Sequence, residues 1–171
     1  HLALARSRVP DQDIGMVSTL HPDGWRYWLE IPEEVDPTTL IRGLTRVLLL
    51  EYANRTANDK SAEVPLWLSE GMVAEIAATT GPELVPQSVP DGWMRRTTRH
   101  LKGVDALQEA RIHLRTNSAP SFSDITLPSP EMMKSANLKL FQSTAHLLVH
   151  QLAGLTNGPA RIASMLGALP H

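Results

Sequence analysis

The sequence predicts one mostly helical α+β domain, on three observations. The chain has 171 residues, 42% of them hydrophobic, enough for one sizeable core, and no break in composition divides it. Two strand-like runs, residues 14–20 and 25–31, lie near its beginning. Apolar residues at helical spacing dominate from residue 36 onward. We therefore expect a single domain (1–171) with a β-rich part over residues 1–35 and a helical part over residues 36–171.

Turn and cap residues place the first elements. Residues 21–24 read HPDG, and a proline followed by an Asp-Gly pair is typical of the turn of an antiparallel hairpin. Asp36 and Pro37 provide an N-cap and a proline at the first helical position, so a helix is expected over residues 36–54. This helix is apolar on most sides, as a helix through the middle of a domain would be. A second helix is expected over residues 65–79.

The rest of the chain is expected to be helical, with some irregular segments. Residues 83–91 are interrupted by proline, and the basic residues 95–100 are interpreted as a solvated surface because no aromatic side chains interleave them. Residues 117–130 are interpreted as a loop that lays Phe122 and Ile125 on the core. Further helices are expected at residues 104–115, 131–136, 138–152 and 159–169.

Composition excludes several classes of function. Sixteen basic and eighteen acidic residues give a net charge of −2, so the chain lacks the positive charge typical of nucleic-acid-binding proteins. The absence of cysteine excludes disulfides, thiolate zinc sites and a cysteine nucleophile. The longest apolar run, residues 47–50, is far shorter than the roughly 20 residues of a membrane span. We therefore expect no nucleic-acid partner and no membrane span in this chain.

Two short motifs carry the functional information. Residues 42–48 read RGLTRVL, and residues 67–71 read WLSEG. In these motifs the chain resembles the gluzincin zinc metallopeptidases of the aminopeptidase-like type, in which one helix reads H-E-L-T-H-V-L and a second reads W-L-x-E-G. The resemblance covers residues 40–76 and, more loosely, the helix at residues 140–152. It implies a gluzincin, or zincin-like, catalytic-domain fold.

The resemblance also implies that the metal site has been replaced. In the family, two histidines at i and i+4 of a helix bind one zinc ion, and a glutamate beside the first acts as general base. Arg42 and Arg46 stand at the histidine positions, and arginine cannot lose its proton to bind a metal. Gly43 stands at the general-base position, and Phe141 where relatives often carry a tyrosine. Glu70, at the position of the third ligand, is retained.

Glu70 shares a helix face with apolar residues and is expected to be at least partly buried. Because an unpaired buried carboxylate is costly, we expect it to form an ion pair with Arg46, or with Arg42 one turn earlier. Two alternatives stay open. In the first, Glu70 is a relic of the zinc site that is exposed to a cleft. In the second, Arg42 and Arg46 belong to a solvated polar stripe.

His146 and His150 also have metal-ligand spacing, because H-x-x-x-H places both rings on one helix face. With Phe141, Ala145 and Leu148 taken as the core stripe, both histidines fall on the opposite, solvent-facing side. They are therefore interpreted as an ordinary surface pair, and as weak metal candidates only.

Three functions are open. The preferred one is a catalytically inactive pseudopeptidase, without metal or cofactor, that keeps the scaffold for binding or structural use, with a peptide or protein in a residual groove. The second is a hydrolase with a relocated metal site at His146 and His150, together with Glu131 or Asp124. The third is a purely structural piece of a larger exported protein. Because relatives of this family are often exported or membrane-attached, the resemblance favours an exported or periplasmic location.

Overall fold

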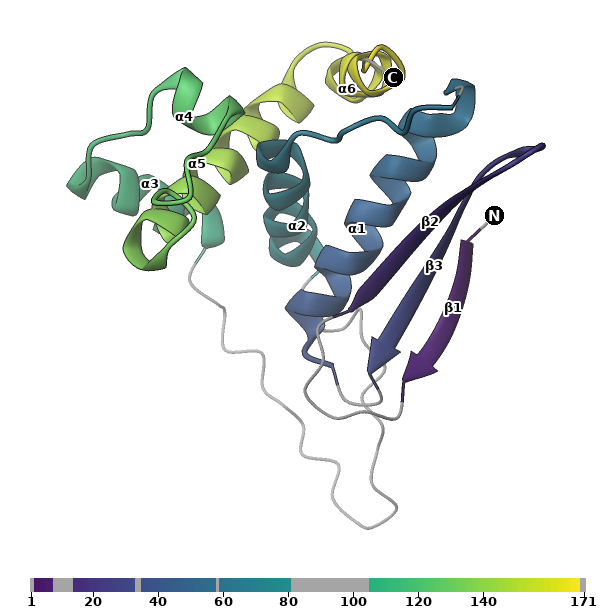
Figure 1. Ribbon diagram of the computed structural model, residues 1–171. Helices are drawn as coiled ribbons and strands as arrows, with labels where there is room; N and C mark the ends of the chain where they lie inside the picture. The colour runs from purple at the N-terminus through teal and green to yellow at the C-terminus, as the bar shows by residue number, and fades with distance from the viewer. Residues whose placement is uncertain (1, 8–13, 33–34, 58, 81–104, 170–171) are drawn as a thin grey trace.

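The computed structural model describes residues 2–7, 14–32, 35–57, 59–80 and 105–169, which form a small sheet beside a larger group of helices (Figure 1). In chain order the elements are β1 (Leu2–Ser7), β2 (Gly15–His21), β3 (Gly24–Pro32), α1 (Pro37–Ala53), the 3-10 turn η1 (Asn54–Thr56), α2 (Leu66–Thr80), α3 (Ala106–Thr116), α4 (Phe122–Thr126), α5 (Ser135–Gly154) and α6 (Gly158–Gly167). The expected α+β class with mostly helical content is confirmed. None of the helices in these segments is long and apolar enough to cross a membrane.

The sheet has the strand order β1-β3-β2, so β3 is central. β2 and β3 form the expected antiparallel hairpin, with Val17 opposite Trp28. In its turn, Gly24 has a φ of +116°, a conformation that favours glycine. β1 pairs with β3 in parallel and was not predicted, because a parallel neighbour leaves no hairpin signal between the two strands.

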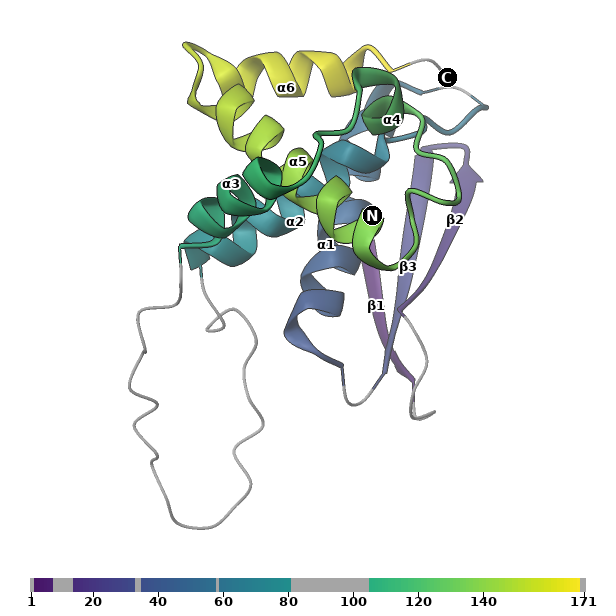
Figure 2. The same cartoon turned by 90° about the vertical axis from the view of Figure 1, so that its left-hand side faces the viewer.

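Helix α1 lies between the sheet and the other helices (Figures 1 and 2). It begins as expected, with Asp36 Oδ1 accepting hydrogen bonds from the amides of Thr38 at 2.9 Å and Thr39 at 3.0 Å. The hydrogen bonds from Thr39 lower the pKa of the Asp36 carboxyl. Val47 belongs to a core cluster with β3, whereas Leu49 belongs to a second cluster with α2, α5 and α6. Two opposite sides of α1 are therefore buried, as its apolar sequence predicts.

A buried polar link joins the sheet to the end of α1 and to the loop before α2. The hydroxyl of Tyr27 accepts a hydrogen bond from Nδ2 of Asn54 at 2.7 Å and donates to the carbonyl of Leu50 at 3.3 Å. Asn54 also donates to the hydroxyl of Ser61 at 3.0 Å and accepts from the amide of Ala62 at 2.6 Å. Burial raises the pKa of Tyr27. This link fixes where the chain leaves α1 and hence where α2 starts.

Helices α2 and α5 approach closely at Gly71. A Cβ atom at this position would overlap the carbonyl oxygen of Ala145 and lie 2.5 Å from a methyl group of Val149. Trp67 and Phe141, both buried, pack in the same cluster. Gly71, the last residue of the WLSEG motif, is thus required for packing.

Three expectations for residues 117–136 were wrong: the uninterrupted loop, the packing of Phe122 on the core and the separate helix at residues 131–136. Residues 122–126 form the short helix α4 instead of a loop, because Ser121 and Asp124 make a capping box. Ile125 is buried as expected, but Phe122 is 80% exposed. The helix directs Ile125 inward and leaves Phe122, at its first position, outside the core.

The limits of the later helices differ slightly from expectation. α5 begins at Ser135, and turns precede it, so residues 131–136 do not form a separate helix. α3 and α6 occupy nearly the predicted ranges. Residues 83–91 and 95–100 lie outside the described part of the chain.

The close approach of α2 and α5 gives a direct prediction. Replacing Gly71→Ala should lower the free energy of unfolding by about 1–3 kcal/mol, because the new methyl group forces the helices apart. Gly154→Ala is the matched control, since nothing lies within 4 Å of the added atom and alanine favours a helix. Urea denaturation of both variants measures the difference. Equal stability of Gly71→Ala and the wild type would contradict the packing described.

Candidate functional site

A charged hydrogen-bond cluster joins α1, α2 and α5, and the sequence had singled out two of its three residues, Arg42 and Glu70. Nε of Arg42 donates to Oε1 of Glu70 at 2.9 Å, and Nη2 of the same arginine donates to Oε2 at 3.3 Å. Nε2 of Gln142 donates to Oε2 at 2.9 Å. The Glu70 side chain is only 10% exposed, and that of Arg42 is 40% exposed. The carboxylate thus receives three hydrogen bonds, two of them from a planar guanidinium that matches its shape.

The expected ion pair of Glu70 is confirmed, and its partner is Arg42. Arg42 lies in the second turn of α1, whose start is fixed by the Asp36 cap. One turn later the buried residue is Thr45, and Arg46 is exposed. No ion pair joins Arg46 to another residue in the segments that the structure describes. Of the two arginines expected as partners of Glu70, Arg42 therefore forms the pair and Arg46 does not.

Gly43 lies against the β hairpin. A Cβ atom on Gly43 would lie 3.0 Å from Cδ1 and 3.1 Å from Cγ2 of Ile14, which precedes β2. A larger side chain at this position would require Ile14 to move. Gly43 therefore allows close contact between helix and hairpin, a role that its interpretation as a missing general base did not include.

Two hollows flank Arg46 on the surface. The first, of ≈ 350 Å³, lies between α1 and the hairpin and is lined by Ile14, Met16 and Leu29 together with Arg42, Gly43 and Arg46. The second, of ≈ 290 Å³, lies between α1 and the segment that leads into α2, where Glu63 and Ser69 contribute polar groups. Arg46 lines both hollows, so its guanidinium carries a positive charge at their shared border.

Two adjacent residues of α5 have different roles: Phe141 packs in the core, and Gln142 forms a polar contact with α2. Phe141 is fully buried and belongs to the core cluster, so it fills space and forms no polar contact at the site. The adjacent Gln142 supplies the hydrogen bond to Glu70. Gln142 was not predicted as a site residue, because a single glutamine in a helix carries no recognisable spacing.

The interpretation of His146 and His150 as a solvent-facing pair was wrong. His146 is 3% exposed, and its Nε2 lies 3.1 Å from Oε2 of Glu75 on α2. Nδ1 of His150 lies 3.2 Å from both oxygens of the same carboxylate. The side of α5 opposite the expected core stripe is covered because α5 packs against α2, α3 and α6 rather than against one neighbour. Single-helix periodicity could not reveal this.

The histidine cluster does not form a metal centre. Across the described residues, no set of three or more histidine, aspartate or glutamate side chains is arranged to hold a metal ion. An ionised carboxylate only accepts hydrogen bonds, so each imidazole donates the N–H that faces Glu75. The two carboxylates expected as further ligands of a relocated metal site have other partners. Asp124 belongs to the cap of α4, and Glu131 forms a 3.0 Å ion pair with Lys134.

A further polar contact joins α3 and α5. The hydroxyl of Ser143 lies 3.3 Å from Nδ1 of His113, which belongs to α3. Ser143 therefore has a neighbouring imidazole that the sequence did not reveal. Its own amide lies within helix α5 and is therefore not available to stabilise an oxyanion.

Among the described residues around Glu70, Arg42 binds both carboxylate oxygens, and Gly43, which has no side chain to accept a proton, follows it in α1. Comparison of the chain with protein-family models, with curated proteins and with solved structures gives no match. The gluzincin resemblance thus rests on the two motifs and on the helices that carry them.

The Arg42–Glu70 pair should contribute measurably to stability. Glu70→Ala removes three hydrogen bonds and leaves a half-buried guanidinium without its partner, so the free energy of unfolding should fall by about 1–3 kcal/mol. The matched control is Glu131→Ala, which breaks an exposed ion pair with Lys134 and should change little. Urea denaturation compares the two. If Glu70→Ala unfolds with the wild type, the pair has no structural role.

The two histidines should differ in their effect on stability. His146→Ala opens a cavity and removes a donor to Glu75 in the interior, so it should lower the free energy of unfolding by about 2–3 kcal/mol. His150→Ala, with a side chain that is 36% exposed, should cost less than about 1 kcal/mol. Thermal or urea unfolding of each single variant measures the order. The reverse order would mean that His146 is not buried as described.

Proposed function

We propose that this chain is a pseudopeptidase: a gluzincin-like scaffold without zinc or hydrolytic activity, retained for binding. The observation that carries the proposal is the bidentate Arg42–Glu70 ion pair. Its two residues stand at positions that hold a zinc ligand each in the family. They face each other from α1 and α2 at 2.9 Å, which supports the idea that the helices keep the relation that a shared metal would require.

Charge compensation explains why an arginine suits this position. Glu70 is a carboxylate in a largely buried setting, and without a cation it would be unstable there. A guanidinium supplies a permanent positive charge and two donors, so it replaces the electrostatic role of a metal ion while removing its Lewis acidity. In this proposal Arg42 both stabilises the scaffold and removes one metal ligand.

The same proposal assigns a binding role to the hollows beside Arg46. One lies between α1 and the hairpin and the other between α1 and the segment that leads into α2, and Arg46 has no ion-pair partner in the described segments. A peptide with an acidic side chain or a carboxyl terminus would neutralise this charge. We include in the proposal an exported or periplasmic setting, where such a binding module would meet peptides. The relocated hydrolase has less support, because Glu75, His146 and His150 form no metal-binding arrangement.

The absence of zinc chemistry is testable on the purified chain. After dialysis against a weak chelator, elemental analysis should find no stoichiometric zinc, and a quenched-fluorescence peptide library should show no cleavage above a buffer blank. The physical reason is that arginine and glycine replace two ligands and the base. About one zinc per chain together with cleavage would contradict the proposal.

Peptide binding is the positive test. Fluorescein-labelled acidic peptides should bind the wild type more tightly than basic peptides of equal length, as measured by fluorescence anisotropy. Arg46→Glu reverses the charge at the hollows without touching the Arg42–Glu70 pair, and should weaken acidic-peptide binding by at least about tenfold. Arg161→Glu, an exposed change on α6, is the control. Equal effects of the two variants, or no binding at all, would argue against a peptide groove at this site.

A further inference from the structure

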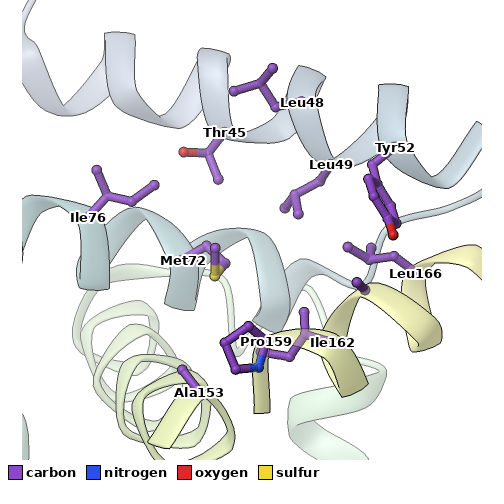
Figure 3. A pocket seen from close by; sticks show the side chains of 11 residues that line it. Thr45, Leu48, Leu49, Tyr52, Met72, Ile76, Ala153, Pro159, Ile162 and Leu166 are labelled. Atoms are coloured by element: carbon purple, nitrogen blue, oxygen red, sulfur yellow. The ribbon is translucent and has the colours of Figure 1, made fainter. Parts of the chain in front are cut away.

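A second cavity lies on the side of α1 that faces the other helices. It has a volume of ≈ 370 Å³ and is enclosed by α1, α2, the end of α5 and α6. Figure 3 shows Thr45 and Leu49 projecting from α1 toward Met72 of α2 and toward Pro159 and Ile162 of α6. This volume falls within the usual range for small-molecule sites, about 300–1,000 Å³. We call it the apolar pocket.

The lining of the apolar pocket is almost entirely hydrocarbon. Only the hydroxyl groups of Thr45 and Tyr52 and the sulfur of Met72 interrupt it, and no lining side chain carries a charge. An extended peptide inside it would leave its backbone N–H and C=O groups without partners, which is costly. An alkyl chain has no such groups, so the chemistry of the lining favours one.

Two apolar side chains at the pocket are exposed. Leu48 is 56% exposed and Tyr52 is 36% exposed, and both line the pocket. Covering such surface with hydrocarbon is favourable in proportion to the area removed from water. The pocket therefore gains binding energy from an alkyl chain without any change in the protein.

One arginine lies beside the pocket. The guanidinium of Arg55 lies 4.9 Å from the centre of the Tyr52 ring, and it forms a 3.1 Å ion pair with Glu51. Arg55 is 61% exposed and so retains free donor groups. These donors can bind an anionic headgroup at this rim.

We propose that the apolar pocket binds a single-chain amphiphile with an anionic headgroup, the alkyl chain between α1, α2 and α6 and the headgroup at Arg55. This function is independent of the peptide site, because the two sites share no lining residue. It requires neither the gluzincin resemblance nor the Arg42–Glu70 pair.

The test is isothermal titration of the full chain with dodecanoate below its critical micelle concentration. We expect saturable binding of one molecule per chain, with affinity falling about threefold to fourfold for each methylene removed in the series to octanoate. Dodecyltrimethylammonium, which has the same tail and the opposite charge, should bind several-fold more weakly. No saturable binding of dodecanoate would overturn the proposal. Equal affinity for the two headgroups would overturn the role of Arg55.

Matched variants locate the site. Ala163→Phe should fill the pocket and abolish dodecanoate binding, and Arg55→Gln should remove the preference for the anionic headgroup. Leu155→Ser is the control, since it removes an exposed apolar side chain that does not line the pocket. Circular dichroism must show that each variant is folded. Unchanged binding in Ala163→Phe would place the ligand elsewhere and overturn the proposal.

Two other occupants are distinguished in the same samples. Analytical ultracentrifugation of the wild type should show no self-association that dodecanoate reverses. A dimer dissociated by dodecanoate would show that a second copy covers the pocket, which overturns a ligand site. If the protein sediments with phosphatidylglycerol vesicles but does not bind monomeric dodecanoate, it attaches to a lipid surface. That result would also overturn the ligand site.

Discussion

The carboxylate of Glu70 must be compensated, and this constraint organises the centre of the molecule. It lies at the start of α2 with little exposure to solvent, so it needs donors from neighbouring helices. Arg42 supplies them from α1 and Gln142 from α5. One carboxylate thus holds three helices in a fixed relation. The sheet is attached to this group through Tyr27 and Asn54 at the other end of α1.

A second carboxylate of α2, that of Glu75, is also bound by side chains of α5, about one helical turn after Glu70. Glu75 is held by His146 and His150, as Glu70 is held by Gln142. Between the two polar groups lies Gly71, where the backbones are in contact. Close backbone packing and buried polar groups depend on each other here, because shifting the helices to fit a larger residue would also break the hydrogen bonds.

Local signals predicted the elements, and contacts between elements decided the rest. The hairpin turn, the Asp36 cap and the WLSEG motif each act within a few residues, so the sequence was sufficient for them. The burial of Glu70 and its ion pair were also predictable, since a buried acid demands a cation. The choice of Arg42 over Arg46, the burial of His146 and the role of Gln142 depend on how three helices cross. β1 was missed for a related reason, because its partner is distant in sequence.

The central proposal is that α1 and α2 are related as two metal-binding helices would be, with Arg42 in the place of the metal. Its most direct measurement is zinc titration of the double variant Arg42→His/Arg46→His, with Gly43 unchanged because a side chain there would meet Ile14 at 3.0 Å. The two histidines and Glu70 would then form three ligands of a tetrahedral site. The account predicts one tightly bound zinc per chain, absent from the wild type and lost when Glu70→Gln is added. A folded double variant that binds zinc no better than the wild type would contradict it.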